Sequence, residues 1–321
     1  MPLFVLRRLL SFVLTLLATS AVVFAVLELL PGNAAQVILG ETATPESIAA
    51  MEEKLGLNQP AATRYLNWMG GMLQGQTGLS ISYDTPTGQL MAERMQVTLP
   101  LAVMAMGLTV ALALALGIYA ASQQNKAGDV GVMTLSQLGL ALPNFWLAIL
   151  LILLFAVHLE WVSAGGFPGW SEDDGGGVFE GIKALLLPAM ALAAVQTAIL
   201  TRVTRSAVLD TLREDFVRTA RAKGLSRRQV LWGHVLRNAM IPVLTVMGLQ
   251  FGNLITSAIV IENVFVLPGI GRLIFQAIAN RDLIVVRDVV MLLSALVILI
   301  NFCIDVLYAW IDPRLKAGHA E

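Results

Sequence analysis

Six runs of about 20 or more mostly apolar residues restrict the fold of this chain more than any other feature. A helix needs about 20 apolar residues to cross the roughly 30 Å hydrocarbon core of a bilayer. Charged residues make up only 13% of the 321 residues, about half the fraction typical of a soluble domain. The sequence therefore predicts an all-α membrane protein with six transmembrane helices. The runs are approximately Leu9–Leu30, Pro100–Ser122, Met133–Leu159, Ala184–Val203, Ala239–Ile261 and Val285–Trp310.

Basic residues are distributed unevenly between the two sides that six spans define. Fourteen of the 21 Lys and Arg residues fall at the termini and in the loops after the second and fourth runs, against seven on the other side. Basic residues mark the cytoplasmic side, so both termini are expected in the cytoplasm. We expect three parts: 1–97, the first transmembrane helix plus an extracytoplasmic helical region; 98–310, a five-helix core; and 311–321, a cytoplasmic tail.

The region outside the membrane carries helix signals of its own. Thr44 and Pro45 provide a capping hydroxyl followed by proline at the first helical position. Pro60 is placed to open a second helix with an apolar side, and a third short helix is expected at about Pro86–Met95. These helices either cap the outer ends of the spans or form a binding surface for an external partner.

The most informative polar stretch is the basic segment, about residues 209–237, which holds most of the chain's clustered positive charge. Apolar residues at helical spacing predict one buried stripe through a first helix. Gly224 is placed to end that helix in the left-handed conformation. Ser226 and Gln229 have the spacing of a capping box, and Leu225 and Val230 that of a hydrophobic staple. The stripe consists of Leu209, Leu212, Phe216 and Ala220.

Three interpretations fit a basic segment between apolar runs. It is an anchor that only fixes orientation, a patch for anionic lipid, or a rigid docking element for a cytoplasmic partner. Helix caps on both sides of one tight turn favour the docking element, because neither orientation nor lipid attraction requires a defined turn.

Several motifs resemble one family. "RTARAKG" (218–224) and "HVLRNAMIP" (234–242) are similar to the conserved cytoplasmic loop of permease subunits in ATP-binding-cassette importers, in particular the dipeptide, oligopeptide and nickel permease group. "ENVFVLPGIGRL" (262–273), "LPGNA", "LGLNQP" and "GQTGLS" resemble further segments of that group. The resemblance covers nearly the whole chain and implies a type I importer permease fold. It also implies the first of two permease subunits in the inner membrane.

The resemblance also implies partners and site residues. The chain lacks the Gly-x-x-x-x-Gly-Lys-Ser/Thr phosphate loop, so it is expected to be no enzyme and to bind no cofactor, with ATP and Mg used by two separate ATPase subunits. A second, homologous permease and an extracytoplasmic solute-binding protein are expected partners. The ATPase-coupling residues implied are Arg218, Thr219, Ala220, Arg221, Lys223, Gly224, Leu225, Ser226, Arg227 and Arg228.

The fifth apolar run carries the polar residues most suited to a translocation path. Gln250, Asn253 and Ser257 fall on one side of a helix with 3.6 residues per turn, and Gly248 and Gly252 form a GxxxG pair suited to helix packing. The amides either line the path or hold helices together. Glu262 is expected near the outer interface and hydrated, and no cluster with metal-ligand spacing is present in the sequence.

The sequence thus predicts the permease subunit of an ATP-driven importer that forms the path for short peptides. Alternatives are the same machine for nickel chelates, glutathione, opines or sugars; an ion-coupled carrier that works alone; and a membrane scaffold that transports nothing. A carrier requires carboxylates at mid-depth in the spans, and a scaffold leaves the capped basic segment without a role.

Overall fold

The computed structural model describes residues 2–29, 35, 39, 43–54, 56–173 and 175–311. The "LPGNA" motif (30–34), Leu55 and residues 312–321, which include most of the predicted tail, lie outside these ranges. In the described part, regular structure is helical apart from one isolated β-bridge, Leu79–Pro86. The elements are α1 (Pro2–Leu29), α3 (Pro45–Lys54), α4 (Ala61–Leu73), α5 (Thr87–Ser122), α6 (Ala127–Ala141), α7 (Asn144–Leu151), η1 (Ile152–His158), α8 (Val178–Thr211), α9 (Asp215–Ala222), α10 (Arg227–Val230), η2 (Leu231–Val235), α11 (Leu236–Val264), α12 (Ile270–Ala279) and α13 (Leu283–Ile311).

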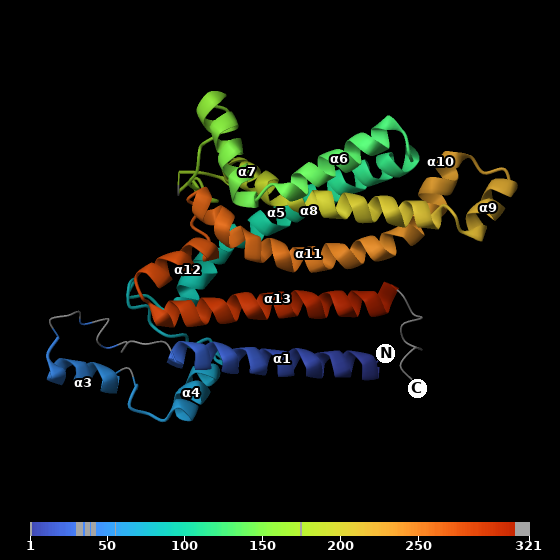
Figure 1. The fold of residues 1–321 in the computed structure, drawn as a ribbon. Coiled ribbons are helices and arrows are strands. Elements are labelled where there is room, and N and C mark those ends of the chain that lie inside the picture. The colour runs from blue at the N-terminus through green and yellow to red at the C-terminus, as the bar shows by residue number, and fades with distance from the viewer. Residues whose placement is uncertain are drawn as a thin grey trace. The chain divides into compact units, whose positions relative to one another are not determined.

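The helices form two compact units (Figure 1). The first contains residues 98–268 together with the chain from residue 300 onward, and the second contains residues 2–97 and 269–299. Two helices, α5 and α13, contribute one part to each unit.

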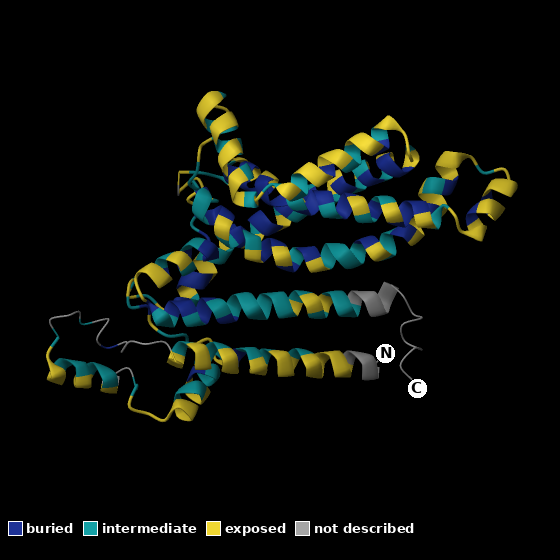
Figure 2. Ribbon diagram, viewed as in Figure 1, coloured by how far each residue is buried: buried dark blue, intermediate teal, exposed yellow. Residues whose placement is uncertain are grey.

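In the first unit, α8 is the central helix. It packs against α6, α7 and α11, and 67% of its most apolar 18-residue window is buried, more than in the other long helices. Figure 2 shows buried positions repeating along α8. Small residues allow this close packing: a Cβ placed on Gly117 of α5 would lie 2.6 Å from Cβ of Thr204 and 2.9 Å from the carbonyl oxygen of Thr201, both on α8.

In the second unit, two buried acidic residues, Asp282 directly before α13 and Asp288 within it, bind the segment that runs from α4 to the start of α5. Asp288 is fully buried and accepts hydrogen bonds from the Trp68 indole (2.8 Å) and the Thr87 hydroxyl (2.6 Å). Asp282, also fully buried, accepts from the Ser80 hydroxyl (2.6 Å) and the Ser82 N–H (3.0 Å). The segment from Trp68 in α4 to Thr87 at the start of α5 is therefore held by two carboxylates that lie 200–220 positions away in the sequence.

The predicted membrane spans are confirmed with one qualification. Five helices are long and apolar enough to cross a membrane, and a sixth span requires the pair α6 and α7–η1 to count as one. That pair, which covers the predicted run Met133–Leu159 except for Leu159 and begins at Ala127, is bent by 101°. Leu142 is extended (ψ 125°) ahead of Pro143, as expected because a following proline disfavours the helical conformation. The third predicted span is therefore a pair of helices broken at Leu142–Pro143.

Two of the three helices predicted for the region between the first two spans are confirmed, and the third is corrected. α3 begins at Pro45, and the Thr44 hydroxyl accepts the N–H of Ser47 at 3.3 Å; α4 begins directly after Pro60. The short helix expected at about Pro86–Met95 is instead the first part of α5, which continues through Pro100. A proline removes one backbone hydrogen bond, but here it does not end the helix.

The structure also corrects the prediction made for Glu262. It is fully buried in α11 and accepts a hydrogen bond from the Thr98 hydroxyl at 2.6 Å. The prediction that Glu262 is hydrated is therefore wrong, because the residue is enclosed within the first unit and bonded to Thr98 of α5.

Candidate functional site

The first helix of the basic segment, α9, ends in a Schellman turn. The N–H of Leu225 donates to the carbonyl of Ala220 (3.4 Å), and the N–H of Gly224 donates to the carbonyl of Arg221 (2.9 Å). These two hydrogen bonds define the motif and satisfy carbonyls that the helix end leaves open. Gly224 has a φ of 84°, in the left-handed region that glycine adopts without steric cost. The prediction that Gly224 ends this helix is confirmed.

The second helix begins with the predicted capping box. The Ser226 hydroxyl accepts the N–H of Gln229 (3.3 Å), and the Gln229 side-chain oxygen accepts the N–H of Ser226 (2.9 Å). From Arg227 the helix continues through the π-helical turn η2 into α11, giving one helical stretch to Val264. The basic segment is therefore joined to a membrane helix by continuous helix and not by a loop.

Apolar side chains of the basic segment pack against long helices of the same unit. Val217, Val230 and Val235 are fully or almost fully buried. They belong to one cluster with residues of α5, α8 and α11, and Leu225 packs against it. Figure 1 shows α9 and α10 at one end of α8. The turn is thus capped locally and packed against three long helices. The helix partners in the cluster are Ala113, Ala121, Leu200, Ala207, Val208, Leu209, Leu236, Ala239 and Val243.

The predicted apolar stripe is wrong at one position. Phe216 is 40% exposed, whereas its neighbour Val217 is fully buried. The prediction extended a single helical phase from Leu209 onward. In the structure α8 ends at Thr211 and α9 starts again at Asp215, so the intervening turn changes which residues face the core.

The predicted coupling residues lie mostly on the solvent side of the basic segment. Ala220 is the exception, because it is buried in the apolar cluster, and Leu225 is half-buried. Arg218 approaches Asp215 at 3.4 Å, but both side chains are largely exposed, and such pairs add little stability. The charged face is therefore available to a partner. The exposed members are Arg218, Thr219, Arg221, Lys223, Gly224, Ser226, Arg227 and Arg228.

One exposed aromatic residue of the basic segment was not predicted. Trp232 is 62% exposed and lies in η2. With Ser226, Arg228 and Gln229 it lines a hollow of about 600 Å³. A tryptophan inside a basic stretch is the sequence signal that indicates such a surface, since aromatic and arginine side chains are enriched in protein interfaces.

The polar residues of α11 do not share one environment. Gln250 is buried and donates to the carbonyl of Gln196 in α8 at 3.2 Å, which is the geometry of an amide that holds two helices together. Asn253 is exposed and Ser257 half-buried. Gly252 is buried, and a Cβ placed on Gly248 would lie 2.6 Å from the Ile304 side chain. Both glycines thus occupy positions where a side chain has little room.

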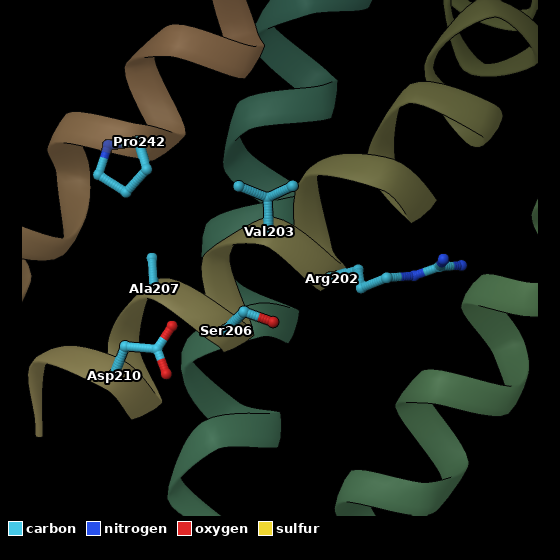
Figure 3. A pocket seen from close by; sticks show the side chains of 6 residues that line it. All are labelled: Arg202, Val203, Ser206, Ala207, Asp210 and Pro242. Atoms are coloured by element: carbon cyan, nitrogen blue, oxygen red, sulfur yellow. The ribbon is translucent and has the colours of Figure 1, made fainter. Parts of the chain in front are cut away.

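A hollow of about 290 Å³ lies between α8 and α11 (Figure 3). It is lined by Arg202, Ser206 and Asp210, which follow one another at four-residue intervals on α8, and by Pro242 of α11. Figure 3 shows the Arg202 side chain extending away from Pro242 and from Asp210. The opposite charges do not converge on one point, so this hollow lacks the arrangement of a ligand site.

Comparison with known proteins gives the chain its family. The family described as "Binding-protein-dependent transport system inner membrane component" matches residues 113–317. The corresponding N-terminal family of membrane components matches residues 1–113. The chain belongs to this family of permeases. The resemblance expected from the motifs at 218–224 and 262–273 is therefore confirmed, and the chain is a multi-pass inner membrane component.

Individual permeases are similar over almost their full length. The dipeptide transport system permease protein of Alkalihalophilus pseudofirmus is 38% identical over 98% of this chain and 99% of its own. The di/tripeptide transport system permease protein of Pseudomonas aeruginosa is 37% identical, with 98% of each chain covered. The glutathione transport system permease protein of Salmonella choleraesuis is 40% identical, again with 98% of each covered.

Solved importer structures confirm the type I permease fold. A chain of the inward-facing MetNI methionine ABC transporter superposes with a TM-score of 0.58 at 16% identity, covering 70% of this permease and 97% of that chain. A chain of an amino acid ABC transporter gives a TM-score of 0.53 at 14% identity, covering 68% and 93%. A permease of such an importer acts together with ATPase and other partner subunits.

Proposed function

We propose that this permease forms the translocation path for short peptides in an ATP-driven importer. The peptide class is supported by the relatives that are named for dipeptide, di/tripeptide and glutathione transport, at 37–40% identity over nearly the whole chain. Glutathione is itself a tripeptide, so these names describe one chemical class of substrate.

The basic segment is the docking site for the ATPase in this proposal. The observation that carries it is the combination of a Schellman turn at Gly224, a capping box at Ser226 and an apolar attachment to α5, α8 and α11. A docking element transmits movement only if it does not deform, and each of these features stiffens the turn. The exposed basic residues and Trp232 supply the contact surface.

The chain itself contributes no ATPase site to this machine. Its sequence lacks the glycine-rich loop and lysine that hold nucleotide phosphates. Two partner ATPases bind ATP and Mg and perform the hydrolysis. A second, homologous permease completes the path, and an extracytoplasmic solute-binding protein delivers the peptide.

Reconstitution in lipid vesicles tests this function. The chain is assembled with a second permease and two ATPases of the same importer, with the solute-binding protein added outside, and uptake of radiolabelled dialanine is followed. We expect uptake only when ATP and all subunits are present. Uptake by the isolated chain along an ion gradient would contradict the proposal and favour a stand-alone carrier.

A further inference from the structure

An ion pair that lies outside every predicted site joins the beginning of α6 to α8. Asp129, in the first turn of α6, is 3% exposed. The Arg205 side chain on α8 meets it with two bonds, Nε to Oδ1 at 2.5 Å and a terminal nitrogen to Oδ2 at 2.6 Å. Paired bonds of this kind fix the relative orientation of both groups as well as their distance.

The same carboxylate also holds the turn between α5 and α6. The N–H of Asn125 donates to Asp129 Oδ2 at 2.9 Å, and Asn125 has a φ of 62°. The Tyr119 hydroxyl, near the end of α5, lies so close to Gly128 that a Cβ there would be 2.7 Å away. One buried carboxylate thus connects the turn, α6 and α8, while Tyr119 at the end of α5 packs against the neighbouring Gly128.

Arg205 lies near the end of α8 that packs against the basic segment. Ala207, Val208 and Leu209, within the next turn of the helix, belong to the apolar cluster that packs against Val217 and Val230. α8 ends at Thr211, and α9 begins four residues later. A displacement of the basic segment therefore acts directly on the end of α8 that carries Arg205.

A contribution to stability does not by itself explain why a buried ion pair is present here. Apolar residues of similar volume often replace a buried ion pair without loss of stability. The two hydrogen bonds instead fix the orientation of α6 relative to α8, because they oppose sliding and rotation of one helix against the other. α6 also packs against α8 along its length and leads to the 101° bend before α7.

We propose that Asp129 and Arg205 are positioning residues that make α6 follow α8 when a partner ATPase moves the basic segment. This inference rests on the proposed function, because it needs an ATPase that acts on this chain. In this proposal the pair transmits the movement of α8 to α6. ATP hydrolysis itself takes place elsewhere and does not require the pair.

The test compares two rates in the same vesicles. The complete transporter is reconstituted with Asp129→Asn, Arg205→Gln or Arg205→Lys, and dialanine uptake and ATP hydrolysis are both measured. We expect hydrolysis to continue while uptake per ATP falls about tenfold in Asp129→Asn and Arg205→Gln, within the range that single residues of coupling networks produce. Arg205→Lys keeps the charge without the planar fork, and an intermediate ratio is expected.

Two matched variants separate coupling from folding. Asp173→Asn makes the same chemical change at an exposed position of the outer loop, and its ratio should equal that of the wild type. Leu192→Ala removes buried apolar volume from α8 and lowers stability while the ion pair stays intact. It should reduce the amount of assembled transporter and leave uptake per ATP unchanged.

Three results would overturn the inference. The first is an unchanged uptake per ATP in Asp129→Asn. The second is a parallel loss of uptake and hydrolysis that follows the amount of assembled transporter, as in Leu192→Ala. The third is wild-type vesicles without ATP-dependent uptake, which would contradict the proposed function on which the inference rests. The first two leave that function intact, so the two failures are distinguishable.

Discussion

The indole N–H of Trp68 donates to the carboxylate of Asp288 at 2.8 Å, and this bond joins α4 to α13 across 220 positions of the sequence. Both residues are buried. The guanidinium carbon of Arg287 lies 4.7 Å from the centre of the Trp68 ring, and Phe24 and Tyr65 pack beside it. This arrangement connects α4 to α1 and α13 within the second unit.

Removal of the Asp288 carboxylate should destabilise this arrangement. Asp288→Ala leaves the Trp68 indole and the Thr87 hydroxyl buried without their acceptor, and each such group costs about 1–3 kcal/mol. We expect the free energy of unfolding to fall by roughly 2–5 kcal/mol, measured by denaturant unfolding in detergent. Asp173→Ala, at an exposed position of the loop before α8, should change it by less than about 0.5 kcal/mol. Equal effects of both substitutions would contradict the structural role of Asp288.

Two glycines of α5 should respond oppositely to the same substitution. A Cβ on Gly117 would collide with Thr204 and with the Thr201 carbonyl, whereas a Cβ on Gly107 would have nothing within 4 Å. Gly117→Ala should lower the free energy of unfolding by about 1–3 kcal/mol, the usual cost of overpacking. Gly107→Ala should raise it by up to about 1 kcal/mol, because alanine favours helix. Denaturant unfolding in detergent measures both effects. An unchanged free energy of unfolding in Gly117→Ala would show that α5 and α8 are not in close contact.

The capping box of α10 should contribute to the stiffness of the basic segment. Ser226→Ala removes the acceptor for the Gln229 N–H and should destabilise the local helix by about 1 kcal/mol. Amide hydrogen exchange of residues 226–230 should then be faster, while Ser226→Thr, which keeps the hydroxyl, should exchange like the wild type. Equal exchange in the alanine and wild-type proteins would mean that the cap does not stabilise this turn.

Sequence reasoning identified the features that depend on neighbouring residues. Gly224 and the Ser226–Gln229 pair were predicted because a helix end requires particular residue types within about four positions. The family was found through contiguous motifs. The spans were found through apolar length, which is a property of each segment alone.

The features that depend on packing were not predicted. Val217 is buried, and not Phe216 as predicted, because the turn after Thr211 interrupts the helix and changes which residues of α9 face the core. Glu262 is buried because Thr98, 164 positions away, covers and binds it. The Asp129–Arg205 pair joins residues 76 positions apart, and no local pattern in one sequence marks such a pair. The bend before Pro143 was obscured because its flanks are apolar on both sides.

Substitution of Gly224 tests most directly whether the basic segment transmits movement from an ATPase. A Cβ at Gly224 has nothing within 4 Å in this chain, so within the permease the effect of a substitution arises from the backbone, and a second substitution that also adds a Cβ controls for contact with the ATPase. Asparagine tolerates a positive φ, whereas a β-branched valine does not. Valine here is expected to cost about 1–3 kcal/mol of strain.

The measurement is ATP-dependent dialanine uptake by the complete transporter at matched amounts of the chain in the membrane. Gly224→Val should reduce uptake at least about fivefold, the factor that ~1 kcal/mol represents, while Gly224→Asn should retain most of it. Wild-type uptake in Gly224→Val would contradict the claim that a rigid turn couples this permease to its ATPase.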